Sequence, residues 1–135
     1  MKIVLDTNVL ISALIKEGKP RNLLREIISN HTLVISKKLL EELAITANEP
    51  KILRYVNQQD IADFLRDLSG SAEFVRTRSR FRLVKEDPED DIVLRTAYDG
   101  KASYVASDDR HLLSLKGFRR IRIVTVDQML KILKG

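Results

Sequence analysis

Short apolar runs alternate along the chain with longer segments in which apolar residues recur at helical spacing. The short runs end abruptly in polar residues, as strands buried on both faces of a parallel sheet do. Strand followed by helix throughout predicts an α/β fold in which helices cover both faces of a parallel sheet. We expect five strands, at residues 3–5, 33–35, 73–75, 103–107 and 122–124.

Helix boundaries carry signals of their own. Ser36 is expected to cap a helix, and Asp87 followed by Pro88 is a strong helix start. We expect helices at 8–16, 20–28, 37 to near 50, 57–68, 88–98, 112–117 and from 125 onward. No linker, repeat or low-complexity tract interrupts them, so residues 1–135 are predicted to form a single domain.

Four carboxylates are predicted to meet at one edge of this sheet. In right-handed β-α-β units, strand carboxyl ends and helix amino termini share an edge, which is where such sheets bind ligands. Two of the acids directly follow predicted strands, and the other two lie early in predicted helices. We therefore expect convergence of Asp6, Glu42, Asp90 and Asp108.

Helical phase helps to choose among neighbouring acids. A step of about 100° per residue places Asp90 on the buried face of its helix and Asp91 with Arg95 on the outer face. Glu42 lies on the flank of an apolar face, which favours Glu42 over Glu41 but leaves both open. Each acid also has a structural explanation, since aspartate caps helices and acids are favoured in a first helical turn.

Carboxylates gathered in a partly buried crevice repel one another unless a cation lies among them. Oxygen donors select hard cations, so Mg²⁺ or Mn²⁺ fits this cluster better than zinc. The chain has no cysteine, which excludes disulfides, iron–sulfur clusters and thiolate zinc sites. Its five glycines form no phosphate-binding loop of the G-x-x-x-x-G-K type.

The formal net charge of +5 favours an anionic partner, and nucleic acid is the commonest one. No segment approaches the ~20 consecutive apolar residues of a membrane span. Only three apolar residues separate Lys2 from Asp6, which is too few for a signal peptide. We expect a cytoplasmic protein with no membrane partner.

Taken in order, these residues resemble the PIN-domain ribonucleases, most closely their VapC-like toxin–antitoxin branch. The similarity covers essentially the whole chain. Each motif alone is short, but their order and intervals make the resemblance specific. It rests on Asp6-Thr7-Asn8, Ser36 with Glu42, Asp87-Pro88-Glu89-Asp90-Asp91 running on to Ala97, Ser107-Asp108 before Leu112-Leu113, and Ile123 to Thr125.

The resemblance implies a three-layer α/β/α sandwich with a central, mostly parallel sheet. It implies an endoribonuclease that uses Mg²⁺ or Mn²⁺ to hydrolyse RNA phosphodiester bonds, a homodimer, and a small antitoxin protein as partner. Asn8 would orient the first aspartate or a metal-bound water, and Ser107 would support the last aspartate. By position, the catalytic and metal-binding quartet is Asp6, Glu42, Asp90 and Asp108.

One position departs from the toxin pattern. Many toxin members carry a further aspartate three residues after the Asp108 position, where this chain has His111. A second metal ion would therefore need Asp109 or Asp91 as a ligand.

An arginine stripe leads into the Asp87–Asp91 motif. It consists of Arg76, Arg78, Arg80 and Arg82, and in an extended segment its guanidinium groups would project to one side. One hypothesis is that the stripe binds RNA phosphates near the catalytic edge. A solvated connection that carries arginine for solubility explains the pattern equally well.

Other functional classes remain open alongside the nuclease. A non-catalytic PIN-like RNA-binding or protein-interaction domain would have the same fold. Phosphatases and phospho-receiver domains also place an aspartate after their first strand. Asp6-Thr7-Asn8 lacks the second aspartate of the phosphatase D-x-D-x-T motif, and no receiver-type lysine is evident.

Overall fold

The computed structural model describes the backbone of residues 1–81 and 88–135 and the side chains of residues 1–81 and 91–135. Within that part, six strands form one sheet in the order β3-β2-β1-β4-β6-β5. All neighbours pair in parallel except β5 with β6, which are antiparallel. The strands are β1 (Lys2–Leu5), β2 (Thr32–Ser36), β3 (Glu73–Val75), β4 (Tyr104–Ala106), β5 (Gly117–Phe118) and β6 (Ile121–Val124).

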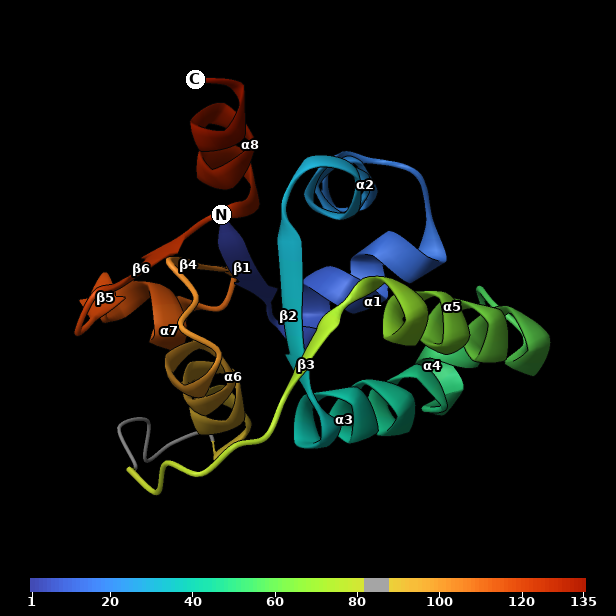
Figure 1. Cartoon of the computed structure of the whole chain (residues 1–135). Coiled ribbons are helices and arrows are strands. Elements are labelled where there is room, and N and C mark those ends of the chain that lie inside the picture. Colours follow the sequence, from blue (N-terminus) through green and yellow to red (C-terminus); the bar gives the residue numbers. More distant parts are fainter. Residues whose placement is uncertain (82–87) are drawn as a thin grey trace.

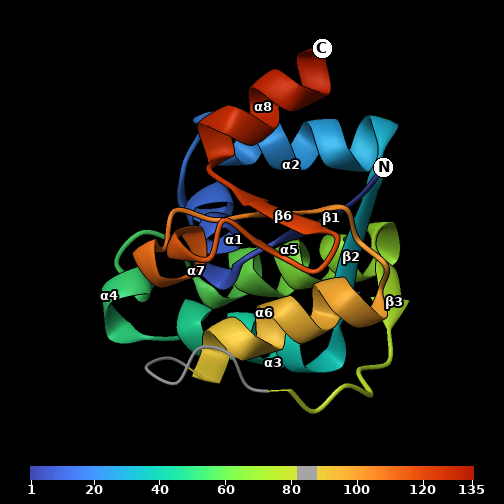
Figure 2. The ribbon, with the colours of Figure 1, turned by 90° about the vertical axis from the view of Figure 1, so that its left-hand side faces the viewer.

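Helices cover both faces of this sheet, so the predicted three-layer α/β/α sandwich is confirmed (Figures 1 and 2). One face packs against α1 (Thr7–Ile15), α2 (Lys19–Asn30), α5 (Gln58–Ser71) and α8 (Val126–Lys134). The other face packs against α6 (Pro88–Asp99) and α7 (Arg110–Ser114). The helix α3 (Lys37–Ala47) contributes to both cores, and α4 (Pro50–Leu53) follows it. Among the described residues, no helix has the length and apolar character needed to cross a membrane.

The first strand is the centre of the fold. Ile3, Val4 and Leu5 have no exposed surface. Because side chains alternate along a strand, Ile3 and Leu5 enter the core beneath α1 and α2, whereas Val4 enters the core beneath α6. β1 pairs with β2 on one side and β4 on the other, as expected for an apolar run buried on both faces.

Two short elements were absent from the sequence prediction. The predicted five strands omitted β5, which has only two residues and pairs through a tight turn with β6. The third predicted helix, drawn to near Pro50, in fact ends at Ala47, and Pro50 begins the separate four-residue helix α4. Proline suits the first turn of a helix, where its missing N–H has no partner to lose.

The helix caps agree with the sequence signals. The Ser36 hydroxyl accepts a hydrogen bond from Leu39 N at 3.2 Å, which confirms it as the cap of α3. Asn57 and Asp60 form a reciprocal capping box at the start of α5. Asp87, the predicted cap of α6, lies outside the described residues.

Gly100 follows α6 at a point where the backbone approaches the sheet closely. A Cβ atom there would lie 2.5 Å from Val34 Cγ1 and 2.9 Å from Thr96 O. The next residue, Lys101, takes the left-handed conformation (φ 55°) that more often falls to a glycine after a helix. Glycine at position 100 is therefore required by packing rather than by a positive φ.

We expect Gly100→Ala to lower the free energy of unfolding by roughly 1–3 kcal/mol, because the added methyl group overpacks a buried site. The measurement is urea denaturation followed by circular dichroism. Gly70→Ala is the matched control, since its Cβ would meet nothing within 4 Å in an exposed turn of α5. That control should be neutral or stabilise by roughly 0.5–1 kcal/mol. Equal effects at both positions would contradict this packing argument.

Candidate active site

The carboxyl ends of β1 and β4 lie side by side at one edge of the sheet. Leu5 is in register with Ala106, so Asp6 and Ser107 leave the sheet together. Asp6 N also donates to Ala106 O at 3.2 Å, which continues the pairing one step past the strand. The topology thus joins two residues a hundred positions apart, as the strand-end argument predicted.

Asp6 is held at this edge by two hydrogen bonds. Its Oδ1 accepts from Val9 N at 3.1 Å, which caps α1, and its Oδ2 accepts from the Ser107 hydroxyl. The Ser107 oxygen in turn accepts from Asp109 N at 2.9 Å. Asp6 can therefore both cap α1 and belong to a site at the sheet edge, because Oδ1 accepts the capping bond and Oδ2 accepts the bond from Ser107.

Burial raises the pKa of Asp6 above its ordinary value of 3.8. The side chain is only 4% exposed, so its charged form is poorly solvated. The Ser107 hydroxyl and the backbone N–H groups of Val9 and Asn8 oppose the shift, whereas the negative charge of Asp109 adds to it. The carboxylate therefore lies where a nearby cation would relieve both desolvation and repulsion.

The acids after β4 are arranged differently from the sequence prediction. Asp108, the predicted ligand, is exposed, whereas Asp109 is half-buried and close enough for its charge to act on Asp6. The carboxylate of Asp109 caps α7 by accepting from His111 N at 2.7 Å. Ser107 was expected to support Asp108, but its hydroxyl contacts Asp6.

Glu42 and Glu41 differ in exposure as the helical phase predicts. Glu42 is half-buried and Glu41 is exposed, so Glu42 faces toward the protein. The start of α3 is fixed to α6 by a buried hydrogen bond of 2.7 Å between the hydroxyls of Ser36 and Thr96. Sequence reasoning missed Thr96, whose hydroxyl also donates to Ile92 O at 2.8 Å.

The predicted orientation of Asp91 is wrong. Asp91 is only 4% exposed, whereas the sequence placed it on the outer face of α6 with Arg95. The phase argument assumed that α6 buries one face, but the sheet, α3 and residues 76–81 cover it from several sides. The Asp90 side chain lies outside the described residues.

Among the described side chains, no three carboxylates or imidazoles converge closely enough to hold a metal ion. The oxygen donors nearest the strand ends are those of Asp6 and Asp109. The Asp6 carboxylate accepts from the Ser107 hydroxyl and from the backbone N–H groups of Val9 and Asn8, and an ionised carboxylate has about four acceptor sites, so one remains for a cation. A carboxylate set of this kind fits Mg²⁺ or Mn²⁺.

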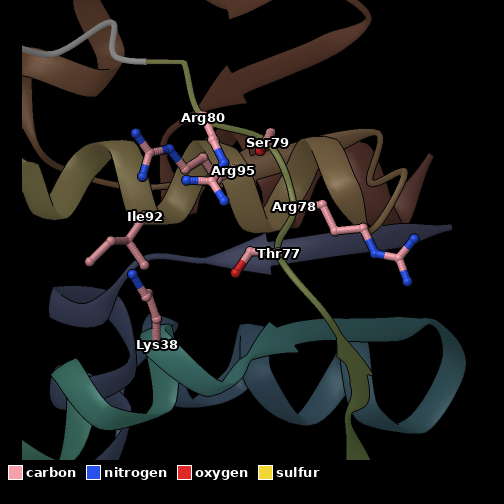
Figure 3. Close-up of a pocket in the computed structure, with 7 residues that line it drawn as sticks. All are labelled: Lys38, Thr77, Arg78, Ser79, Arg80, Ile92 and Arg95. Atoms are coloured by element: carbon pink, nitrogen blue, oxygen red, sulfur yellow. The ribbon is translucent and has the colours of Figure 1, made fainter.

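Residues 76–81, called the strap below, run along α6. The Arg76, Arg78 and Arg80 side chains are exposed, while the residues between them are half-buried. This alternation agrees with the predicted stripe, but the guanidinium groups of Arg78 and Arg80 point in different directions (Figure 3). Arg82 lies outside the described residues.

Asp99, the last residue of α6, holds the middle of the strap. Its Oδ2 accepts from Arg78 N at 2.7 Å, Ser79 N at 3.0 Å and the Ser79 hydroxyl at 2.9 Å. Burial acts to raise the pKa of Asp99, but these hydrogen bonds outweigh it and hold the pKa below 3.8. An acid at a helix carboxyl end opposes the helix dipole, so the strap explains its presence there.

The far end of the strap is held by Arg95 and by aromatic packing. Arg95 Nε donates to Phe81 O at 2.9 Å. The Phe81 ring packs against Phe118, with 4.8 Å between centroids, and against Tyr98 at 5.9 Å. The strap is therefore fixed to α6 along its length, which argues against a freely solvated connection.

Residues 2–111 match the family model described as the PIN domain. The chain belongs to the PIN-domain family. PIN domains are generally nucleases, which hydrolyse phosphodiester bonds.

Two individual proteins illustrate the relationship. The uncharacterized protein MJ1680 of Methanocaldococcus jannaschii is 32% identical over 122 residues, which cover 86% of this chain and 76% of that protein. The crystal structure of VapBC2 from Rickettsia felis, bound to a DNA fragment from their promoter, contains a chain with a TM-score of 0.63. That match covers 91% of this PIN domain and 97% of the other chain at 18% identity, so it is a likeness of fold.

We expect Asp6→Asn to stabilise the metal-free protein, with a gain that grows as pH rises. The pKa of Asp6 is higher in the folded protein than in the unfolded chain. The contribution of Asp6 to stability is therefore fully present below the pKa of the unfolded state and is lost as pH rises through the pKa of the folded state. The asparagine cannot ionise and avoids this loss. Urea denaturation in EDTA from pH 4 to pH 8 measures the difference. An exposed aspartate on α5 gives the control, Asp67→Asn, and a gain that failed to depend on pH would contradict the burial argument.

We expect Asp99→Ala to release the strap. Loss of three hydrogen bonds to one carboxylate should speed trypsin cleavage after Arg76, Arg78 or Arg80 at least about tenfold. Mass spectrometry of timed digests identifies the cleaved bonds. Asp63→Ala, which removes a carboxylate from α5, should leave these rates unchanged. Unaltered cleavage in Asp99→Ala would show that Asp99 does not hold the strap.

Proposed function

We propose that this PIN domain is a divalent-metal-dependent endoribonuclease that hydrolyses RNA phosphodiester bonds. The observation that carries the proposal is the buried Asp6 carboxylate at the joint carboxyl ends of β1 and β4, with Asp109 beside it. Burial raises the pKa of this carboxyl, so a cation bound beside it would stabilise its charged form. Membership of a family of nucleases supplies the reaction class.

The residues that would hold Mg²⁺ or Mn²⁺ are Asp6, Glu42, Asp90 and Asp108, with Asp109 and Asp91 as further acids near them. The bound ion would activate water and offset charge on the scissile phosphate. The chain itself contributes position, because the Val9 N–H and the Ser107 hydroxyl fix the two oxygens of Asp6. We assign Asn8, which is exposed beside Asp6, to orienting water at the same edge.

We extend the proposal to the biological role, as the toxin of a toxin–antitoxin pair that acts in the cytoplasm. The fold likeness to a chain of the VapBC2 structure supports this role. A small antitoxin protein would then be the regulatory partner, and a homodimer the working assembly. The alternative is a PIN-like RNA-binding or protein-interaction domain without cleavage. Since the quartet acids are all present in the sequence, the catalytic proposal is the stronger one.

The deciding experiment compares RNA cleavage in Mg²⁺ and in Mn²⁺ for wild type, Asp6→Asn, Asp90→Asn and Glu42→Gln. We expect each variant to lose roughly a hundredfold or more in rate, because each removes a charge from the metal site. Glu41→Gln is the matched control on the same turn of α3 and should retain cleavage. Circular dichroism confirms that the variants are folded.

Metal binding gives a readout that does not depend on finding the right RNA. Mn²⁺ at a hundred times its dissociation constant should stabilise wild type by about 2.7 kcal/mol and Asp6→Asn by much less. If wild type neither cleaves RNA nor binds Mn²⁺ in the millimolar range, the non-catalytic alternative is the correct one.

A further inference from the structure

A pocket of about 340 Å³ lies between α3, α6 and the strap. Four of its seven lining residues are cationic, and none of the seven is acidic. Figure 3 shows Lys38 reaching from α3 toward α6 and the Thr77 hydroxyl directed to the same space, whereas the Arg78 guanidinium points away. The lining residues are Lys38, Thr77, Arg78, Ser79, Arg80, Ile92 and Arg95.

Most donors of these cations are unused within the described part of the chain. The salt bridges found there involve none of Lys38, Arg80 and Arg95. Arg95 donates from Nε and Nη2 to Phe81 O, and its Nη1 donates to none of the described residues. Cations that line one pocket repel one another, so an anion that accepts their hydrogen bonds is the favoured occupant.

The pocket borders the proposed catalytic edge. Lys38 lies one helical turn before Glu42 on the same face of α3, because residues four apart are neighbours on a helix. Ile92 directly follows the buried Asp91 in α6. The pocket lining is therefore within about one helical turn of Glu42 on α3 and of Asp91 on α6.

We propose that this pocket binds a phosphate of the RNA backbone, a neighbour of the phosphate that is cleaved. The assignment rests on the proposed function and adds to it the path of the substrate. Lys38 supplies a point charge, Arg80 and Arg95 supply planar forks, and Thr77 supplies a hydroxyl donor, all suited to phosphate oxygens. Because Asp99 and Arg95 fix the strap to α6, the Arg80 backbone is preorganised beside the site.

An acidic segment of a protein partner is the competing occupant of a basic pocket. The position of this pocket favours RNA, since a nuclease must hold its substrate on both sides of the cleaved bond. The net charge of +5 gives the whole chain the sign that attracts a polyanion. Of the stripe's three described arginines, Arg80 is the one that contributes to this pocket, because Arg76 does not line it and the Arg78 guanidinium points away (Figure 3).

The test is binding of a fluorescently labelled single-stranded RNA in EDTA, measured by anisotropy over a range of NaCl concentrations. EDTA removes divalent ions, so binding is measured without cleavage. We expect Lys38→Gln and Arg80→Gln each to reduce the salt slope by roughly 0.7 and the double variant by roughly 1.4, the values for lost single-strand phosphate contacts. Affinity at low salt should fall roughly fivefold for each variant.

Arg76→Gln is the matched control, because Arg76 is an exposed arginine of the same strap that does not line the pocket. Its salt slope should stay at the wild-type value. Equal losses in Arg76→Gln and Arg80→Gln, or unchanged slopes in both pocket variants, would overturn the proposal. The proposal also fails if wild type binds no RNA at low salt, which would leave an acidic protein segment as the occupant.

Cleavage assays separate this inference from the proposed function. If wild type cleaves RNA while the pocket variants bind with unchanged salt slopes, the nuclease stands and the pocket assignment fails. If the pocket variants lose salt slope as expected but wild type cleaves nothing in Mg²⁺ or Mn²⁺, the phosphate pocket stands and catalysis fails.

Discussion

The pairing of β1 with β4 is the constraint on which the candidate site depends. It brings Asp6 and Ser107 out of the sheet at the same level, so that a hydroxyl from one strand end holds a carboxylate from the other. The same carboxylate caps α1 through Val9 N, which fixes its second oxygen. A buried acid in this position opposes folding when ionised, because its charge is poorly solvated. The arrangement sacrifices stability at the proposed catalytic edge, as active sites commonly do.

The second organising contact is the attachment of the strap to α6. Asp99 accepts three hydrogen bonds from the strap, and Arg95 donates to its far end. Both residues belong to the helix that begins with the proposed metal-binding acids, so the strap and the acids share one rigid support. A basic segment that would otherwise sample many conformations is thereby held against α6, near the proposed catalytic edge.

Local patterns in the sequence were sufficient to predict the layers of the fold and the meeting of the ends of β1 and β4 at one edge of the sheet. Apolar runs such as Ile3 to Leu5 mark strands, and the right-handed crossover rule then places Asp6 near the end of β4. Elements without such a pattern were missed: β5 has two residues, and α4 begins at a proline that usually ends a helix. The burial of Asp91 and the bonds of Asp99 depend on segments packing across α6, which helical phase alone does not contain.

Negative and positive charge are separated along α6. Its amino-terminal turn is acidic in sequence, while Arg95 in the middle and the strap beside it present positive charge to the neighbouring pocket. At the strand ends Asp109 adds to the negative potential at Asp6, whereas the seven residues that line the pocket include no acid. The acids at the strand ends repel one another, and so do the cations around the pocket. A divalent cation would offset the first repulsion and an RNA phosphate the second when the two bind together. This is the electrostatic pattern that the proposed metal-assisted cleavage of RNA would use.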